Sequence, residues 1–288
     1  MKVNNEWKDF EVLATGGGEK LERWGKVKLL RPDPQVIWPA SYDLSKEQNL
    51  NAHYIRESTG GGHWDKIKNF PDEWQIGWRD LKFSIKPMGF KHTGLFPEQA
   101  VNWAQMIDLI KKSNREIKVL NLFAYTGGAT VACASAGAKV CHVDAAKGMV
   151  ERAKENLSLS GLADKPVRFI VDDCKKFVER EIRRGNRYDG IIMDPPSYGR
   201  GPSGEVWKIE DSIFDFVKLC FEVLTDNPLF VLINSYTTGL QPTVMKNILE
   251  LNCKISGKTF KNIDAYEIGL QTKENIVLPC GASALASN

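Results

Sequence analysis

The stretch 118–144 constrains the fold of this chain more than any other part of it. It reads as a short apolar strand at 119–123, a turn at Gly127 and Gly128, a helix of small residues at 129–136, and a second strand that ends on a carboxylate. Paired glycines let the backbone approach a ligand closely just before a helix N-terminus. This order of elements is typical of α/β units that bind nucleosides.

Asp144 lies 17 residues beyond Gly127, where an acidic side chain accepts hydrogen bonds from ribose hydroxyls. A dinucleotide site would need three glycines at alternate positions of the first turn. Here those positions hold Phe123, Tyr125 and Gly127, so only the last is glycine. The stretch therefore predicts a site for a nucleoside without a pyrophosphate. A strand-turn-helix unit that binds no ligand is the alternative.

The composition excludes several classes of protein. The chain has 288 residues, 42% of them hydrophobic, with a net charge of +3, which suits a main domain with an appended module. The six cysteines include no C-x-x-C pair, so no metal site is predicted. No apolar run reaches the roughly 18 residues of a membrane span, and the N-terminus lacks the apolar core of a signal peptide. We therefore expect a cytoplasmic protein without a membrane partner.

Residues 1–88 are predicted to form a small β-rich N-terminal module. They contain six of the eight tryptophans among glycine and proline turn signals. The expected β runs are 26–30, 35–38, 53–55 and 81–86. Exposed tryptophans beside basic residues would stack on RNA bases, whereas buried ones would fill the core of the sheet. The second interpretation is favoured, because tryptophan is a normal core residue in small modules.

Residues 89–288 alternate strand and helix patterns, which predicts an α/β domain with a mostly parallel, Rossmann-like sheet. We expect helices at 98–112, 147–160, 175–184, 212–224 and 242–251, and a loop at 203–210. Two closing strands near 255–268 and 274–279 have no long helix between them and therefore predict an antiparallel edge hairpin. The small-residue stretch 281–288 is expected to be a frayed end.

Polar residues follow the predicted strands at the edge where an open parallel sheet binds its ligands. They are Asp144, Asp173, Asp194 and Ser235, together with the turn at Gly127. Asp173 is placed to accept from an adenine amine, with Asp172 as the alternative, and the next backbone N–H, that of Cys174, to donate to the ring. Two prolines after Asp194 keep the backbone rigid, so that its carboxylate and the adjacent carbonyl point at a substrate amine. The alternative is that these prolines only end a strand.

Five segments together carry a resemblance to a known family. They are NLFAYTGG, HVDAA, VDDC, DPPSYG and KHTGLFPEQ. They resemble the class I S-adenosylmethionine-dependent methyltransferases and, more narrowly, are similar to the bacterial family that includes the large-subunit ribosomal RNA cytosine methyltransferases. The resemblance covers about residues 86–240. It implies the class I methyltransferase sheet, S-adenosyl-L-methionine as cofactor and RNA as partner, while the oligomeric state stays open.

The resemblance also implies a role for each matching residue. Phe123 to Gly127 would contact the methionine part of the cofactor, Asp144 its ribose and Asp173 its adenine, while Phe96 and Gln99 would cover it. Asp194 and Pro195 would stand between the sulfonium and the substrate. The complete cofactor set is Phe96, Gln99, Asn121, Phe123, Ala124, Tyr125, Thr126, Gly127, Asp144, Asp173, Cys174 and Asp194. The catalytic set is Asp194, Pro195 and Pro196, and the substrate set is Ser197 and Tyr198.

Two departures from the family pattern bear on the acceptor. Methylation of carbon five of cytosine needs a thiolate that attacks carbon six. The family's RNA enzymes carry that cysteine in the loop after the strand that follows D-P-P, but here the loop reads Asn234-Ser235-Tyr236-Thr237. Cys280 is expected at the opposite rim of the sheet. The chain before Phe90 is also too short for the family's extra RNA-binding domain in addition to the β module.

Three hypotheses follow. The first is a methyltransferase that acts on RNA, with a ribosomal RNA base favoured, or on a non-RNA acceptor. The second is a catalytically silent protein that binds S-adenosylmethionine and RNA, suggested by the absent cysteine. The third is a nicotinamide oxidoreductase, which the missing glycine triplet disfavours.

Overall fold

The computed structural model describes residues 1–57, 61–89, 91–200 and 206–288, and they divide into two compact units. The sheet unit comprises Val101–Ile268 and Gly281–Asn288, together with Met1. The N-terminal unit comprises Lys2–Ala100 and Gly269–Cys280. A domain boundary after residue 88 stays a prediction.

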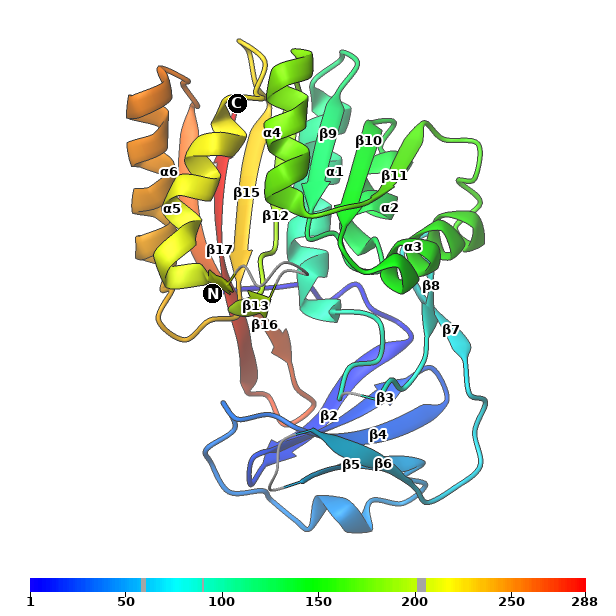
Figure 1. Ribbon diagram of the computed structural model, residues 1–288. Helices are drawn as coiled ribbons and strands as arrows, with labels where there is room; N and C mark the ends of the chain where they lie inside the picture. The colour runs from blue at the N-terminus through cyan, green and yellow to red at the C-terminus, as the bar shows by residue number, and fades with distance from the viewer. Residues whose placement is uncertain (58–60, 90, 201–205) are drawn as a thin grey trace. The chain divides into compact units, whose positions relative to one another are not determined.

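The sheet unit is built on a mostly parallel sheet whose strands run in the order β16-β17-β15-β12-β9-β10-β11 (Figure 1). β10 pairs in parallel with β9 and β11, and β12 pairs in parallel with β9 and β15, whereas β17 is antiparallel to β15. This confirms the predicted Rossmann-like sheet with an antiparallel closing pair. The strand bounds are β9 Lys118–Leu122, β10 Lys139–Asp144, β11 Val167–Val171, β12 Gly190–Met193, β15 Phe230–Ser235, β16 Asn262–Gln271 and β17 Val277–Ser287.

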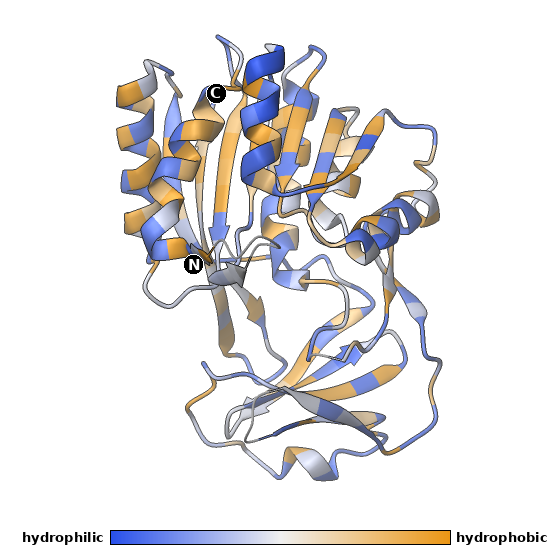
Figure 2. Ribbon diagram, in the orientation of Figure 1, coloured by the Kyte–Doolittle hydropathy of each residue, from blue (hydrophilic) through white to orange (hydrophobic). Residues whose placement is uncertain are grey.

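Helices cover both faces of this sheet (Figure 1). Those on one face include α4 and α5, and α1 and α2 lie on the other. The central strands are apolar and α4 is largely polar, as expected for buried parallel strands and a surface helix (Figure 2). Within the described residues no helix is both long and apolar enough to cross a membrane. The helix bounds are α1 Ala100–Lys112, α2 Gly128–Ser135, α3 Lys147–Leu159, α4 Cys174–Arg184, α5 Ile209–Phe221 and α6 Pro242–Ser256.

The C-terminal stretch differs from the prediction. Residues 281–288 are not a frayed end, because most of them belong to β17, which pairs with β15 in the sheet. Small residues are needed there: a Cβ added to Gly281 would lie 2.8 Å from the carbonyl oxygen of Ser235, and Ala284 and Ala286 are fully buried. Close packing, not low complexity, accounts for this composition.

The register of β17 also corrects the expected place of Cys280. Ala282 pairs with Ser235, the last residue of β15. Because the two strands are antiparallel, the residues that precede Ala282 continue past the carboxyl end of β15. Cys280 therefore lies beyond the carboxyl end of β15. Its predicted place at the opposite rim of the sheet was wrong.

The segment after β12 is also more regular than predicted. A short hairpin pairs β13 Tyr198–Arg200 with β14 Val206–Lys208, and α5 begins at Ile209. The predicted loop at 203–210 is therefore wrong from Val206 onward, and its residues 203–205 lie outside the described residues.

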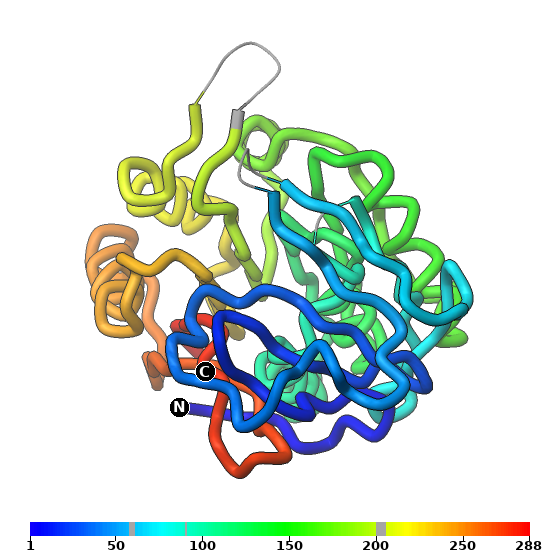
Figure 3. Tube along the Cα trace, turned by 90° about the horizontal axis from the view of Figure 1, so that it is seen from below, coloured from blue at the N-terminus to red at the C-terminus, as the bar shows by residue number. Residues whose placement is uncertain are grey.

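The N-terminal unit contains a five-stranded sheet in the order β2-β3-β4-β5-β6 and a two-stranded sheet, β7-β8. The blue and cyan parts of the tube in Figure 3 trace most of this unit. Pro34 and Gln35 form a turn, with the Val36 N–H donating to the Asp33 carbonyl, so the strand expected at 35–38 was wrong. The other elements are β1 Lys2–Val3, β2 Phe10–Gly16, β3 Glu19–Trp24, β4 Val27–Pro32, η1 Leu44–Lys46, β5 Ala52–Arg56, β6 Gly62–Lys66, β7 Trp74–Trp78, β8 Leu81–Ile85 and η2 Pro97–Gln99.

The six tryptophans of this unit are packed. Trp24 and Trp78 are completely buried, and the other four are half-buried. Every indole N–H donates inside the unit, for example Trp64 to the Met88 carbonyl and Trp74 to the Trp24 carbonyl. These contacts favour the core interpretation over base stacking.

A buried ion pair joins β3 and β4 in the same unit. The Arg31 guanidinium donates to both carboxylate oxygens of Glu22, at 2.7 and 2.8 Å, and the Trp24 indole donates to one of them. Burial raises the pKa of the Glu22 carboxyl, but the nearby charges of Arg31 and Lys20 lower it by more than burial raises it. The net shift of the pKa is therefore downward. The ionised pair therefore stabilises the fold above the unfolded pKa of about 4.5 and loses that contribution as the pH falls below it.

We expect Arg31→Leu to lower the free energy of unfolding by about 3–5 kcal/mol, because it leaves the Glu22 charge buried without its partner. Urea denaturation followed by tryptophan fluorescence measures this, since most tryptophans lie in the unit. Lys46→Leu is the control: it breaks an exposed pair with Asp43 and should cost at most about 1 kcal/mol. Equal losses in the two variants would contradict the prediction.

Candidate functional site

The carboxyl ends of the parallel strands place the predicted residues along one edge of the sheet. Leu122 pairs with both Val143 and Met193, and Met193 pairs with Ile233. The residues that follow these four are Phe123, Asp144, Asp194 and Asn234. The structure thus brings together the turn after β9 and the polar ends of three neighbouring strands.

The turn after β9 has an unusual backbone. Phe123, Tyr125 and Gly127 have φ angles of 54°, 49° and 81°, so all three alternate positions are left-handed. This conformation is ordinary for glycine but uncommon for aromatic residues. The chain therefore follows the path of a glycine-rich turn while presenting two aromatic side chains. The Phe123 ring packs against Trp207 and Phe216, with ring centroids 5.7 and 5.5 Å apart.

Asp144 holds this turn in place. One carboxylate oxygen accepts from the Tyr125 N–H at 2.8 Å, and the other accepts from the Ala146 N–H at 2.8 Å. The carboxylate is half-buried at the end of β10. An ionised carboxylate has about four acceptor positions, so both oxygens can also accept from ribose hydroxyls.

Gly127 caps α2 and leaves no room for a side chain. An added Cβ would lie 2.8 Å from the Ala153 Cβ. We expect Gly127→Ala to lower the free energy of unfolding by roughly 1–3 kcal/mol, measured by chemical denaturation, and to weaken cofactor binding. Gly137→Ala is the control, because Gly137 has a φ of 95° with nothing near its Cβ position. If both variants lose the same stability, backbone conformation alone accounts for the effect.

Other predicted cofactor residues belong to this turn or to the end of β9 before it. The Asn121 amide donates to the Thr130 hydroxyl at 2.9 Å, and that hydroxyl contacts His142 Nδ1 at 2.9 Å. Burial lowers the pKa of His142 to about 3, so this ring is neutral. The Ala124 N–H donates to the Val143 carbonyl, and the Thr126 carbonyl accepts from Asn156. These contacts attach the turn to β10, α2 and α3.

The end of β11 presents one exposed carboxylate. Asp173 caps α4 by accepting from the Lys176 N–H at 2.8 Å, and Asp172 is ion-paired with Arg180. Cys174 is buried, and its sulfur accepts from the Phe123 N–H at 3.2 Å. Burial raises the pKa of this thiol, so it stays protonated. Asp173 thus remains a better candidate for an adenine amine than Asp172 does.

The Asp194-Pro195-Pro196 segment follows β12 directly. The Asn234 side-chain amide donates to Asp194 Oδ1 at 2.8 Å. The Ser197 hydroxyl contacts the Thr237 hydroxyl at 2.5 Å, so the loops after β12 and β15 are joined. Tyr198 is about half exposed. The segment therefore presents a fixed carboxylate with an accessible aromatic ring a few residues later.

Two residues at this edge were missed from the sequence. The Trp207 indole donates to the Pro196 carbonyl at 2.6 Å, and its ring centroid lies 5.7 Å from that of Phe123. Trp207 thus connects the turn after β9 with the segment after β12. The second residue that the sequence analysis missed is Asn234, which contacts Asp194. An isolated tryptophan near D-P-P was a usable signal for the first, whereas nothing in the sequence marked Asn234.

Phe96 and Gln99 belong to the N-terminal unit. Phe96 precedes η2, and its ring packs edge-on against that of His92, with the ring centroids 5.3 Å apart. Its backbone carbonyl accepts from the Gln99 N–H at 3.1 Å. Their assignment to the cofactor stays a prediction.

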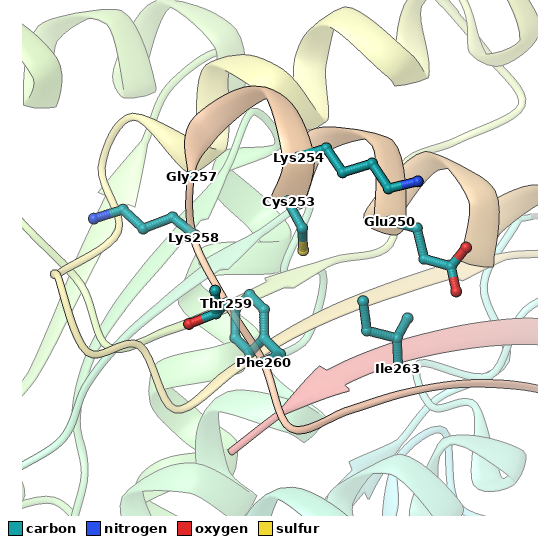
Figure 4. A pocket seen from close by; sticks show the side chains of 8 residues that line it. All are labelled: Glu250, Cys253, Lys254, Gly257, Lys258, Thr259, Phe260 and Ile263. Atoms are coloured by element: carbon teal, nitrogen blue, oxygen red, sulfur yellow. The ribbon is translucent and has the colours of Figure 1, made fainter.

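A separate hollow lies at the end of α6 (Figure 4). Its volume is about 590 Å³, and Cys253, Phe260 and Ile263 are among its lining residues. Because α6 starts after β15 ends, its own end returns to the amino edge of the sheet. The hollow is therefore distinct from the strand ends described above.

Comparison with protein families matches residues 34–210 to the family described as S-adenosylmethionine-dependent methyltransferase. The ribosomal RNA large subunit methyltransferase K/L of Pseudoalteromonas atlantica is 34% identical over 191 residues, which cover 66% of this chain and 26% of that protein. The match thus spans about a quarter of that relative's length.

Solved structures share the whole fold. The SAM-dependent methyltransferase from Agrobacterium tumefaciens is 31% identical, with a TM-score of 0.91 over 99% of this chain and 92% of that one. SMU.776 complexed with SAH has a TM-score of 0.72 at 19% identity, over 97% and 76% of the two chains, and supports the fold alone.

Proposed function

This chain belongs to the S-adenosylmethionine-dependent methyltransferases, and we propose that it transfers the methyl group to a base of ribosomal RNA. The family model covers more than half of the chain, and the Pseudoalteromonas relative is named for ribosomal RNA methylation. An enzyme with this substrate would work in the cytoplasm. The oligomeric state is left open.

The residues at the strand ends fit the cofactor. Asp144 would accept from the ribose hydroxyls and Asp173 from the adenine amine, while the turn from Phe123 to Gly127 would hold the methionine part. S-Adenosylmethionine supplies a methyl group on a sulfonium, which is transferred by in-line displacement. The protein's contribution is then mainly to position the acceptor and to balance its charge.

The hydrogen bond between Asn234 and Asp194 carries the proposal for the acceptor. It fixes a carboxylate directly before two prolines, and Asp194 with the following carbonyl would accept from a base amine. A ring nitrogen or amine needs no covalent nucleophile, whereas carbon five of cytosine needs a thiolate. The segment Asn234-Ser235-Tyr236-Thr237 contains no cysteine, so we propose a nitrogen acceptor.

Cys280→Ser is expected to leave methyl transfer unchanged within about twofold. Cys280 follows the carboxyl end of β15, but burial, with a smaller contribution from Glu98, raises the pKa of its thiol well above the usual value. A protonated thiol is a poor nucleophile. Transfer of labelled methyl to RNA from a deletion strain measures the effect. A loss above about 100-fold would identify Cys280 as the nucleophile and carbon as the acceptor.

Mass-spectrometric mapping of ribosomal RNA from cells with and without the gene tests the proposed substrate. We expect one methylated base to be lost in the deletion strain and restored by the wild-type gene. If the maps are identical and the purified protein still binds S-adenosylmethionine, the acceptor is not ribosomal RNA. Binding of cofactor and RNA without any transfer would identify a catalytically silent protein.

A further inference from the structure

A continuous chain of side-chain hydrogen bonds in the sheet unit ends on Asp194. It begins on α1, where Gln105 donates to the Tyr266 hydroxyl at 2.6 Å, and that hydroxyl donates to Asn102 Oδ1 at 2.9 Å. Asn102 Nδ2 donates to Ser283 Oγ at 3.0 Å. Ser283 donates to Asn234 Oδ1 at 2.8 Å, and Asn234 Nδ2 donates to Asp194 Oδ1 at 2.8 Å.

The interior of this chain is shielded from water. Asn102, Ser283 and Asn234 are at most 1% exposed, and Tyr266 is 5% exposed. Burying four polar side chains is costly unless their hydrogen bonds are satisfied. Within the sheet, Ser283 and Asn234 are also direct cross-strand partners of β17 and β15. Apolar residues would fill these positions at lower cost, so the polar chain calls for an explanation.

The carboxylate at the end determines the direction of every bond. An ionised carboxylate only accepts, so the nitrogen of the Asn234 amide must face Asp194 and its oxygen must face Ser283. The Ser283 hydroxyl then donates to Asn234 and accepts from Asn102, whose oxygen in turn accepts from Tyr266. All five donors therefore point toward Asp194. Bonds aligned in one direction polarise one another, and the last of them is charge-assisted.

We propose that Gln105, Tyr266, Asn102, Ser283 and Asn234 are positioning residues that hold the Asp194 carboxylate in the orientation needed for the methyl acceptor. This inference rests on the proposed role of Asp194 in methyl transfer. Small displacements of a positioned group lower the rate of a displacement reaction strongly, so a fixed carboxylate has a direct catalytic benefit. The chain also links that orientation to α1 and to the β16–β17 pair.

The kinetic test uses substitutions that remove one hydroxyl each. Ser283→Ala and Tyr266→Phe should lower kcat by about tenfold and about threefold, while KM for RNA and the Kd for S-adenosylmethionine stay within about twofold. Tyr188→Phe is the matched control. Tyr188 is also buried, but its hydroxyl donates to Glu181, which is not part of this series of hydrogen bonds. It should change thermal stability without changing kcat. If wild type is active and both chain variants keep its kcat, the proposal is overturned.

A second measurement does not need methyl transfer. The side-chain ¹⁵N–¹H signals of Asn234, observed by NMR without cofactor or RNA, should shift in Asp194→Ala and in Tyr266→Phe, but not in Tyr188→Phe. An Asn234 signal that does not move in Tyr266→Phe would show that the chain does not reach Asp194. If wild type methylates no ribosomal RNA, the proposed function fails, and this signal alone decides whether the chain positions Asp194.

Discussion

Asp194→Ala is expected to abolish measurable methyl transfer, a loss of at least about 100-fold in kcat, while the affinity for S-adenosylmethionine stays within about tenfold. The carboxylate follows β12 and is held by Asn234 at 2.8 Å. Its proposed partner is the acceptor base and not the cofactor, so its removal should affect turnover more than binding. Calorimetry with S-adenosylmethionine and transfer of labelled methyl to RNA from a deletion strain measure the two quantities.

Asp194→Asn separates the charge of this residue from its shape. The amide oxygen can still accept from Asn234, but the variant lacks the negative charge that would stabilise a base amine as it gains positive charge. We therefore expect kcat between those of wild type and Asp194→Ala. Equal losses of turnover and cofactor affinity in Asp194→Ala would instead place this residue in the cofactor site.

Asp144→Ala is expected to weaken binding of S-adenosylmethionine by about 100-fold or more. Two hydrogen bonds from ribose hydroxyls to a charged acceptor would be lost, at about 1.5–3 kcal/mol each. The Tyr125 and Ala146 N–H groups would also lose their acceptor, so the left-handed turn would be less well held. Calorimetry of the folded variant measures the affinity.

Asp144→Asn is the informative companion to this variant. Both carboxylate oxygens accept from backbone N–H groups, so an amide must turn its own NH₂ toward one of them. We expect a clear loss of affinity in Asp144→Asn as well. The exposed Asp164→Ala should bind like wild type. Unchanged affinity in Asp144→Ala would rule out the ribose role.

The sequence predicted the features that follow from the spacing of apolar residues and from the polar residues after each strand. Apolar strands alternating with amphipathic helices led to the correct mostly parallel sheet, because buried parallel strands and packed helices each need their own pattern. The polar ends at Asp144, Asp173 and Asp194 follow from the same rule, since parallel strands share one carboxyl edge. The structure confirms the arrangement, while the roles of these residues stay predictions.

The remaining features depend on contacts that no local pattern encodes. β17 is made partly of glycine, alanine and serine, which give no apolar signal, yet Ala284 and Ala286 are fully buried. Asn234 appeared to be an ordinary strand end, and only the register with Ser283 shows what it contacts. The left-handed angles of Phe123 and Tyr125 contradict residue preferences and are held by tertiary contacts, including Asp144.

The position of β17 has a consequence for biosynthesis. It pairs with β15, but the ribosome makes residues 277–287 only after it has made every other strand and helix described here. Until then β15 has an open edge, and Asn234 lacks the hydroxyl of Ser283. A nascent chain would therefore form the turn after β9 before Asp194 is held in place. If Asp194 positions the methyl acceptor as proposed, synthesis order alone would delay the onset of activity until β17 has been added.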